Sequence, residues 1–382
     1  MVRVAMVVTN PCAPDPRVLR HAAWMQEAGY RVTIHAFDRS QSHPTSQSYK
    51  GVRIMRYRLG DTPFGGTFDT YRGIRRFQRM VIQTLLHNPP SMVYCHDADT
   101  LRVGTALKKS HQIPFVFDMH DLQHTWVRYP APQSILRTFA SGRMKQRMLK
   151  RAKLASAIIT SSGQVSDEGH RGFLQWLRHH GLDGTVVENR PMPPFSTSKQ
   201  PPQKEWTVGY IGRVRDIKAF ELLLSAVKLI PAHERPRLRI AGDGVAAAKV
   251  RRMMMDEVEA GEVEAKITPA FDQSELRELL SEIDVMYAMY SPLRGNILQG
   301  ALPVKMFDSA AYGIPSVVND GCLMSDVVRE EGFGVAAPWG DSELVSRALV
   351  QTKNMCVDLH SNGEREQQRW LDAMSDVFEM IQ

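Results

Sequence analysis

The chain has 382 residues, of which 43% are hydrophobic and 23% are charged. These values are typical of globular proteins, and the length fits two domains better than a single core. The longest apolar runs, such as residues 4–8, are far shorter than a membrane span, so no spanning helix is expected. The four cysteines are scattered and lack a CxxC pair, which predicts reduced thiols and a cytoplasmic protein.

The positive charge is concentrated in the first half of the chain. The formal net charge is +7; residues 1–195 hold 27 Lys and Arg against 13 Asp and Glu, whereas the remainder holds 21 against 28. A basic half joined to an acidic half predicts that the first half meets an anionic partner. A basic but merely solvated surface is the simpler alternative.

Short apolar runs alternate with amphipathic segments through the first half. Residues 2–9 predict a strand rather than a secretory leader, residues 17–28 a helix ended by Gly29, and residues 30–37 a second strand. Such a βαβ unit predicts a parallel, doubly wound sheet. Further strands are expected at residues 52–57, 92–95, 115–118 and 157–161, and basic amphipathic helices at residues 70–86 and 136–154.

Residues 190–203 contain five prolines and predict an interdomain linker, because this composition supports no regular element. A second α/β series follows, with strands expected at residues 207–211, 238–241, 266–268 and 283–287. We therefore expect an α/β fold of two facing Rossmann-like domains with a cleft between them. The predicted boundaries are 1–190 for the first domain, 191–204 for the linker, 205–365 for the second domain and 366–382 for a terminal helix.

Residues 303–319, PVKMFDSAAYGIPSVVN, predict a helix of about three turns, a glycine stop and a buried strand. Pro303 suits the first helical turn and Gly313 the C-cap. Lys305 falls in the first turn, where free amides and the helix dipole favour an anion, and Asp308 follows one turn later, placed to accept hydrogen bonds from hydroxyls. The pair suits a phosphate and a ribose, although these residues taken alone are better explained by an ordinary solvated helix.

Polar groups follow several of the predicted strands. Because the carboxyl ends of parallel strands meet at one edge of a sheet, we expect these groups to line the cleft. They are Asn10, His96-Asp97, His120-Asp121, Gly212-Arg213 and Gly242-Asp243-Gly244. Arg213 and Lys218 would place a planar fork and a point charge beside a glycine turn, which suits a diphosphate. Taken alone, such a pair is more simply a solvated surface.

Five stretches resemble family-4 glycosyltransferases of the GT-B fold, in the family's order and over almost the whole chain. VGYIGRVRDIKAFELLLSAV, LRIAGDG and LPVKMFDSAAYGIPSVVND resemble the donor half, whose pattern is a G-R-x(4)-K-G turn, a G-x-G strand end and a P-x-K-x-F-E-x-x-A-x-G-x-P-V helix. DPRVLRHAAWMQEAGYRVTI and PFVFDMHDL resemble the first half. The resemblance implies a retaining enzyme that moves a sugar from a nucleotide diphosphate-sugar, UDP- or GDP-linked, to a hydroxyl acceptor without a metal or another cofactor.

The resemblance also implies roles for individual residues. Arg213 and Lys218 match the diphosphate-binding pair and would act in catalysis by stabilising the leaving diphosphate. His120 matches the active-site histidine near the donor sugar, and Asp308 matches the second acid of the E-x(7)-E motif, which holds the ribose. The other donor-binding positions are Gly212, Gly242, Asp243, Asn296 and Lys305. The last helix is expected to pack back on the first domain.

In its second half, the chain departs from the family pattern at three positions. Gly300 stands where the first acid of E-x(7)-E falls, Asp308 is shorter than the usual Glu, and Ala219 replaces the glycine after Lys218. The missing acid usually touches the donor sugar, so the sugar stays open. Two alternatives also stay open: a degenerate GT-B partner subunit without catalysis, and a GT-B nucleotide-sugar epimerase or hydrolase.

Other chemistries fit the sequence less well. Residues 96–99, HDAD, contain a D-x-D that binds metal in another glycosyltransferase fold, but their place after a first-half strand argues against a metal here. No P-loop, nucleophile elbow or H-E-x-x-H is present.

The basic helices have no nucleic-acid motif, so an anionic membrane surface is the expected partner, with solvation as the alternative. The acceptor would then be a glycan, a lipid-linked sugar or a small molecule in glycan, glycolipid or envelope polysaccharide synthesis. We accordingly expect a cytoplasmic protein with a peripheral position on the inner face of the cytoplasmic membrane.

Overall fold

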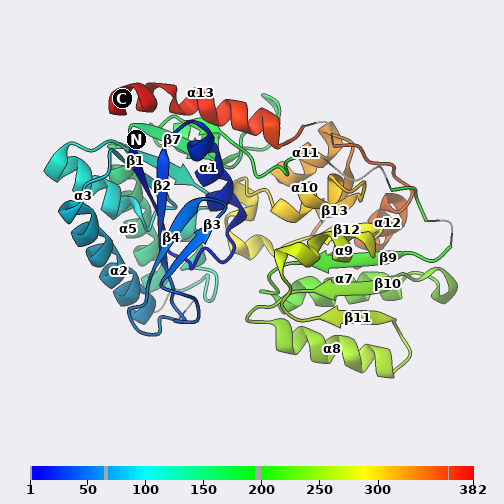
Figure 1. The fold of residues 1–382 in the computed structure, drawn as a ribbon. Helices are drawn as coiled ribbons and strands as arrows, with labels where there is room; N and C mark the ends of the chain where they lie inside the picture. Colours follow the sequence, from blue (N-terminus) through cyan, green and yellow to red (C-terminus); the bar gives the residue numbers. More distant parts are fainter. Residues whose placement is uncertain (1, 64–67, 194–198, 203, 360) are drawn as a thin grey trace. The chain divides into compact units, whose positions relative to one another are not determined.

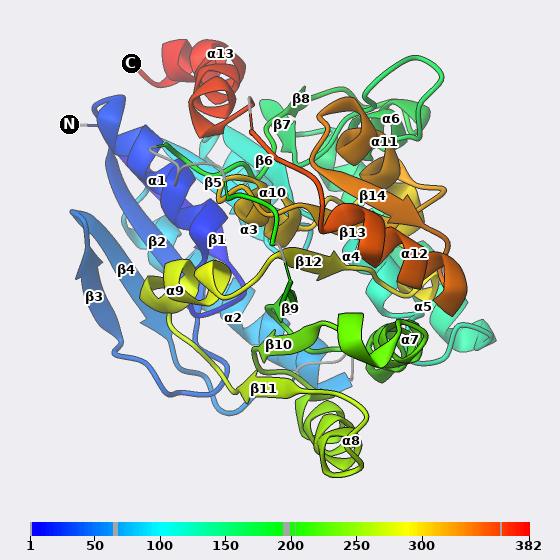
Figure 2. The ribbon, with the colours of Figure 1, turned by 90° about the vertical axis from the view of Figure 1, so that its right-hand side faces the viewer.

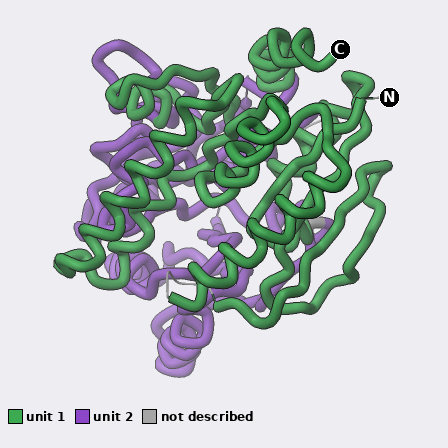
Figure 3. The backbone as a smooth tube through the Cα atoms, turned by 90° about the vertical axis from the view of Figure 1, so that its left-hand side faces the viewer, with its two compact units in different colours: residues 1–163, 173–188, 366–382 green, residues 164–172, 189–365 purple. Residues whose placement is uncertain are grey.

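The computed structural model describes residues 2–63, 68–193, 199–202, 204–359 and 361–382. The chain divides into two compact units (Figure 3). Unit 1 comprises residues 1–163, 173–188 and 366–382, and unit 2 comprises residues 164–172 and 189–365. Each unit is built around its own sheet.

The sheet of unit 1 has eight strands in the order β3-β4-β2-β1-β5-β6-β7-β8 (Figure 2). The strands are β1 (Arg3–Val8), β2 (Arg31–Phe37), β3 (Ser46–Tyr49), β4 (Val52–Tyr57), β5 (Met92–His96), β6 (Phe115–Met119), β7 (Ala157–Thr160) and β8 (Thr185–Val186). Among the described strands of this sheet, only β3 pairs antiparallel, with β4. The order runs outward from β1 and β5 in opposite directions, so the topological switch point lies between these two strands. In a doubly wound sheet, ligands bind beyond the strand ends at this point.

Most helices of unit 1 belong to the crossover connections that parallel strands require. The terminal helix also packs on this unit. They are α1 (Pro16–Glu27), α2 (Phe68–His87), α3 (Leu101–His111), α4 (Gln123–Trp126), α5 (Ile135–Ala152), α6 (Phe173–His179) and α13 (Gly363–Ile381). α3 packs between α2 and α5 in one layer, seen along one flank of unit 1 in Figure 1. Asp15 caps α1 by accepting a hydrogen bond from the Val18 amide.

The terminal helix α13 packs into the core of unit 1. Its Trp370, Met374 and Val377 are fully buried and belong to the same cluster as Val4 of β1 and Val18 of α1. The indole Nε1 of Trp370 donates a 3.0 Å hydrogen bond to the Tyr94 hydroxyl, so the polar tip of the largest buried side chain is also paired. This is the packing expected for the last helix.

The sheet of unit 2 has six parallel strands in the order β11-β10-β9-β12-β13-β14 (Figure 2). They are β9 (Thr207–Ile211), β10 (Arg237–Ala241), β11 (Ala265–Thr268), β12 (Val285–Ala288), β13 (Ser316–Asn319) and β14 (Gly334–Ala337). The α-helices are α7 (Ile217–Lys228), α8 (Ala247–Glu259), α9 (Leu276–Ser281), α10 (Val304–Ala310), α11 (Leu323–Glu330) and α12 (Ser342–Thr352). Short 3₁₀ turns are η1 (Ala232–Glu234), η2 (Gln273–Glu275), η3 (Pro292–Arg294) and η4 (Ile297–Gln299). Here the switch point lies between β9 and β12.

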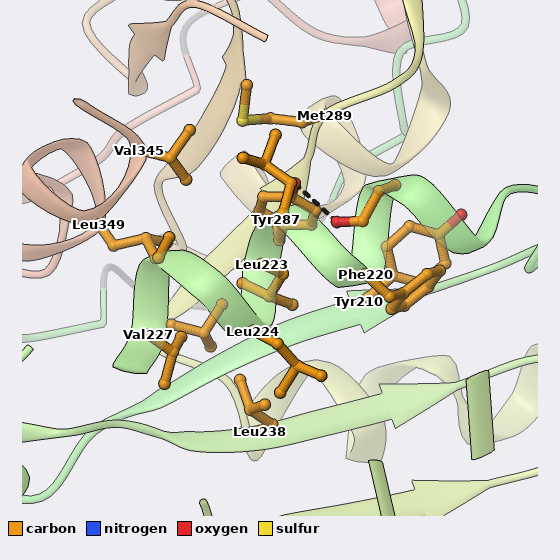
Figure 4. Packing of buried hydrophobic residues seen from close by; sticks show 14 of the residues in the cluster. Tyr210, Phe220, Leu223, Leu224, Val227, Leu238, Tyr287, Met289, Val345 and Leu349 are labelled. Carbon is orange, nitrogen blue, oxygen red and sulfur yellow. Dashed lines mark hydrogen bonds between the residues drawn. The ribbon is translucent and has the colours of Figure 1, made fainter. Parts of the chain in front are cut away.

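α7 is held against the unit 2 sheet by a buried apolar cluster (Figure 4). Leu223 and Val227 of α7 are fully buried in the same cluster as Leu238 of β10. The hydroxyl of Tyr287, at the switch point on β12, donates to the Ala219 carbonyl at 2.9 Å. The first turn of α7 is therefore fixed beside the ends of β9 and β12.

No helix in the described part of the chain combines the length and apolar composition that a membrane span requires.

The structure corrects several predicted details. α10 has seven residues, about two turns rather than three, and Pro303 precedes it as the N-cap. The segment 164–172, expected in the first domain, groups with unit 2. β3 and α6 were not anticipated, and all four side chains of β3 are exposed, so no apolar alternation marks it. Of the predicted linker, residues 194–198 and 203 lie outside the described residues.

Candidate functional site

Asp118 is the centre of a buried polar cluster in unit 1. It lies on β6, and its side chain has no exposed surface. Arg17 of α1 binds it in a fork, with Nη2 2.6 Å from Oδ1 and Nε 3.1 Å from Oδ2. Asp118 Oδ2 also lies 3.1 Å from His96 Nδ1 and 2.8 Å from His120 Nε2. With His21 Nδ1 at 3.2 Å from the same oxygen, one carboxylate therefore orients a guanidinium and three imidazoles.

The charges of this cluster are fixed by burial and by the Arg17–Asp118 pair. Burial alone would raise the pKa of Asp118, but Arg17 and His120 hold that pKa well below its usual range. His21 lies 3.2 Å from Asp118 Oδ2, yet burial lowers its pKa to about 3. Burial also lowers the pKa of His96. The cluster therefore holds an ionised pair beside two neutral imidazoles at neutral pH.

His120 follows β6 and links this cluster to a second acid. Its amide donates to Asp97 Oδ1 at 3.1 Å, and its Nδ1 lies 3.5 Å from Asp97 Oδ2. Burial opposes a charge on the ring, but Asp97 and Asp118 raise the pKa of His120 to about 9. Burial raises the pKa of Asp97 to about 7. His120 and Asp97 are 17% and 22% exposed, so an imidazolium and a carboxyl group are partly accessible at the end of β6.

The same residues come close enough to hold a metal ion. The ligand atoms of His96, Asp118 and His120 all lie within 4.8 Å of one another. Arg17 already binds both carboxylate oxygens of Asp118, and its fixed positive charge opposes a divalent cation there. Metal binding also needs neutral imidazoles, whereas the neighbouring acids keep the pKa of His120 at about 9. The donor set therefore fits a protonated histidine better than a metal.

In unit 2, two glycine turns touch backbone to backbone beside the switch point. Gly212 ends β9 with a φ of 128°, and its amide donates to the Ala241 carbonyl at 2.9 Å. Gly242 follows β10 with a φ of 144°, and a Cβ at this position would overlap the carbonyl oxygen of Gly212. Packing therefore requires a glycine at 242, and the positive φ favours one at 212, whether or not a phosphate approaches them.

Lys305 of α10 lies over an aromatic ring instead of at an open helix end. Its Nζ is 3.2 Å from the centroid of the Tyr210 ring and 5.6 Å from that of Tyr290. This Nζ is buried, and among the described residues no acceptor lies within hydrogen-bond distance. Burial, with Arg294 and Arg215 nearby, lowers the pKa of Lys305 well below its usual value. The cation expected in the first turn of α10 is thus a buried amine beside the Gly212 turn.

The remaining predicted donor-site residues differ in exposure. Arg213 and Lys218 lie at the surface at the start of α7, where Lys218 is 74% exposed and its Nζ is 3.8 Å from Glu221 Oε2. Asp308 is half-buried on α10, one turn after Lys305. Asp243 is exposed, and Asn296 is buried at the start of η4. The structure brings Gly212, Gly242 and Lys305 together and leaves Arg213 and Lys218 in solvent.

Gly300 occupies a position with no room for a side chain. It ends η4 with a φ of 106°, and a Cβ there would lie 2.5 Å from the Cα of Gly172. Gly172 belongs to the segment 164–172, which is attached to unit 2 where His170 Nδ1 lies 2.9 Å from Asp326 Oδ1. The absent acid of the E-x(7)-E pattern therefore coincides with the close packing of this segment.

Reasoning from the sequence missed the residues that hold the His120 cluster of unit 1 and the Lys305 amine of unit 2 in place. Asp118 carried a usable signal, because it is the one charged residue in the apolar run FVFDM of β6. Arg17 could then have been sought as its partner. Tyr210 and Tyr290 carried none, because an aromatic residue at the end of a strand is usually part of a core.

Two family models match this chain. A glycosyl transferase 4-like domain matches residues 13–176, and a glycosyl transferases group 1 domain matches residues 205–354, so that together they cover most of the sequence. The chain belongs to the family-4 glycosyltransferases. Comparison with curated protein sequences gives no match.

Solved structures confirm the GT-B fold of this glycosyltransferase. Sucrose-phosphate synthase from Thermosynechococcus elongatus is 14% identical with a TM-score of 0.71, over 100% of this chain and 98% of that one. The apo lipopolysaccharide outer core galactosyltransferase WaaB is 14% identical with a TM-score of 0.62, over 98% and 100%. Anabaena HepE in complex with UDP and glucose is 14% identical with a TM-score of 0.63, over 100% and 99%. At such identities the likeness establishes the fold alone.

We expect His120 to make the stability of this glycosyltransferase fall as the pH rises. Its pKa is raised from 6.5 to about 9 by folding, so its contribution is complete below pH 6.5 and is lost as the pH rises through about 9. His120→Gln should therefore flatten the decline in unfolding free energy between about pH 7.5 and 9, by at most about 1.4 kcal/mol per pH unit. Urea denaturation at several pH values measures this slope.

His233→Gln is the control, because it removes an imidazole that is 80% exposed and should keep the wild-type slope. Buried cysteines such as Cys95, whose pKa burial raises to about 12, lower the stability of all three proteins equally at high pH. Equal slopes for the wild type and His120→Gln would show that the His120 ring is neutral.

Proposed function

We propose that this glycosyltransferase moves a sugar from a nucleotide diphosphate-sugar to a hydroxyl acceptor, with retention of configuration and without a metal. The observation that carries the proposal is the arrangement at the switch point of unit 2, where the Gly212 turn lies beside the buried amine of Lys305. A diphosphate needs cationic donors and a close backbone approach. Arg213 and Lys218 add two exposed cations, and Asp308 an acid for the ribose.

The chemistry requires stabilisation of the leaving group above all. When the bond between the anomeric carbon and the diphosphate oxygen breaks, negative charge develops on that oxygen, and Arg213, Lys218 and a protonated Lys305 would stabilise it. The acceptor hydroxyl attacks from the same face and passes its proton to the departing phosphate oxygen. Configuration is then retained, and no protein carboxylate is needed as a base.

His120 would contribute to the reaction by binding hydroxyls of the donor sugar. Its ring is partly exposed, and its pKa is raised to about 9 by Asp97 and Asp118 despite burial, so that it carries a positive charge at neutral pH. A charged donor strengthens a hydrogen bond to a hydroxyl.

One observation favours a second candidate function, that of a GT-B partner subunit without catalysis. Gly300 lacks the acid that touches the donor sugar in relatives, and the packing of Gly172 against it leaves no room for one. A partner subunit without catalysis would tolerate this loss. A GT-B epimerase or hydrolase is the remaining alternative, and it would consume the donor when no acceptor is present.

We expect one nucleoside diphosphate to stabilise the protein and to depend on the surface cations. UDP is the first probe, because HepE was solved with UDP, followed by GDP, ADP and TDP. Arg213→Ala and Lys218→Ala should each weaken binding about 10- to 100-fold, since a hydrogen bond to a charged group contributes about 1.5–3 kcal/mol. Thermal shift and calorimetry measure the effect.

Lys249→Ala is the control, since it removes an exposed cation on α8 and should leave binding unchanged. Binding that is unaffected by both site variants would place the nucleotide elsewhere. No response to any nucleotide would favour the partner-subunit candidate, and donor consumption without an acceptor would favour the epimerase or hydrolase.

We expect nucleotide binding to be accompanied by uptake of about one proton at Lys305. Its buried amine has a lowered pKa because of burial, Arg294 and Arg215, and a bound diphosphate would supply the missing counter-charge and raise that pKa. Calorimetry with UDP at about pH 8, where the phosphate is fully ionised, in buffers of different ionisation enthalpy counts the protons.

Lys305→Met should abolish the uptake, whereas Lys218→Met should weaken binding and keep the uptake, because Lys218 is 74% exposed. Binding of UDP to the wild type with no proton uptake would contradict this prediction, because it would show that Lys305 keeps the same protonation state in the free and the bound protein.

We also propose that unit 1 contacts an anionic membrane surface that carries the acceptor. Ile135, Leu136 and Phe139, in the first turns of α5, are 85%, 81% and 64% exposed. Exposed cations lie further along the same helix, among them Arg143 and Arg147. Apolar side chains beside basic ones are typical of segments that lie in a membrane interface. An envelope or lipid-linked acceptor would follow from this contact.

We expect the full chain to sediment with vesicles of phosphatidylglycerol and phosphatidylcholine, more at low salt than at physiological salt. Replacing Ile135, Leu136 and Phe139 together by serine should abolish sedimentation. Val245→Ser, which changes a side chain of unit 2 that is 88% exposed, should not. Absence of wild-type binding at both salt concentrations would contradict the membrane proposal.

A further inference from the structure

A cavity of about 380 Å³ lies in unit 1, between the amino ends of β1, β2 and β4 and the end of α2. Its lining includes Arg3, Arg31, Arg53, His35 and Asn88. The volume is within the range of sites that hold small molecules. The cavity lies at the amino edge of the sheet, whereas His120 follows the carboxyl end of β6. The proposed transfer reaction therefore leaves this cavity unused.

The register of the sheet brings the three arginines together. Arg3 on β1 pairs with Arg31 on β2, and Arg53 on β4 pairs with Thr33, two residues further along β2. Residues two apart on a strand share one face of the sheet, so the arginines lie on the same side. Ala5 pairs with Thr33 on this face, and these small side chains leave the space that forms the cavity.

The positive charge in this cavity is not neutralised by the protein. Among its described lining residues there is no acid. Arg3 donates to neutral acceptors, Asn88 Oδ1 at 2.6 Å and the Pro89 carbonyl at 2.8 Å. In the described part of the chain, Arg31 and Arg53 form no ion pair. Like charges on neighbouring strands destabilise a sheet, so this arrangement favours an anion that comes from outside.

The other polar groups are suited to such an anion. The pKa of His35 is lowered to about 4 by burial and by Arg53, so this ring is neutral and brings no counter-charge. Its Nδ1 lies 2.8 Å from the Tyr57 hydroxyl, which holds the ring in place at the wall of the cavity. Thr33 adds a hydroxyl. Guanidinium groups match the oxygen geometry of a phosphate and can bind it in a bidentate way.

We propose that this cavity binds a small ligand that carries a phosphate group. Three arginines on one face of the sheet supply the positive charge, and the small side chains of Ala5 and Thr33 leave the space for the ligand. The volume limits the occupant to a small molecule. Free inorganic phosphate and a phosphorylated sugar share the required chemistry, and the experiment distinguishes them. The proposal does not depend on the identity of the nucleotide donor.

The test is thermal unfolding of the full chain with inorganic phosphate, glucose 6-phosphate, glucose, or sodium chloride of equal ionic strength. The variant is Arg31→Gln with Arg53→Gln. The matched control is Arg251→Gln with Arg252→Gln, which removes the same charge from exposed positions of α8. A second variant, Thr33→Leu, keeps all three arginines and fills the cavity.

We expect the two phosphate compounds to raise the unfolding midpoint of the wild type and the control by about 2–4 °C at saturating concentration. The double variant and Thr33→Leu should show no such rise. Without ligand, the double variant should unfold at the wild-type temperature or above, because a like-charge contact has been removed. A larger rise with glucose 6-phosphate than with phosphate would assign a phosphorylated sugar, and equal rises would assign phosphate itself.

Two outcomes would overturn the proposal. Equal responses of the double variant and the control would place the anion elsewhere on the protein. No response of the wild type to either phosphate compound, beyond that to sodium chloride, would show that the arginines are simply solvated.

Discussion

The buried ion pair between Arg17 and Asp118 is the constraint on which unit 1 depends. Removing two charges from water costs several kcal/mol per ion, and only close geometry with further hydrogen bonds offsets that cost. Here the pair joins α1 to β6, and Asp118 Oδ2 lies 3.2 Å from His21 Nδ1. His21 Nδ1 lies 2.9 Å from the Tyr94 hydroxyl, which accepts a hydrogen bond from Trp370 of α13. The docking of the terminal helix and the strand-end site therefore share one polar network.

Unit 2 also contains a buried basic group, but this group has no acidic partner among the described residues. In unit 1 the charge on His120 is balanced by Asp97 and Asp118, whereas the buried amine of Lys305 faces the Tyr210 ring and has no acceptor among the described residues. A buried amine without a counter-charge is destabilising unless it loses its proton, although an aromatic face offsets part of the cost. The folded protein tolerates this amine without a counter-charge. An anion that binds beside Lys305 would stabilise its protonated form, as the proposed donor site requires.

The sequence was sufficient for the order of elements and for which residues end the strands, because buried parallel strands are short apolar runs whose carboxyl ends meet at one edge. The sequence did not predict which side chains surround those residues or how deeply they are buried. Lys305 was expected as a free cation, and its burial depends on Tyr210 and Tyr290, which come from two other strand ends. β3 was missed because all four of its side chains are exposed, so no apolar alternation marks the strand in the sequence. α10 was overestimated because its last turn, before Gly313, is not α-helical.

The missing acid at position 300 is tied to the local backbone conformation and to the packing of a neighbouring segment. Two independent constraints act at this position: a φ of 106°, which disfavours any side chain, and the Cα of Gly172, which lies 2.5 Å from where a Cβ would stand. The segment 164–172 that causes the second constraint is attached at its own end, where the His170 ring meets Asp326. An acid at position 300 would require a different backbone conformation there and a different path for this segment. The missing carboxylate and the position of the segment are therefore one structural feature, and no single substitution separates them.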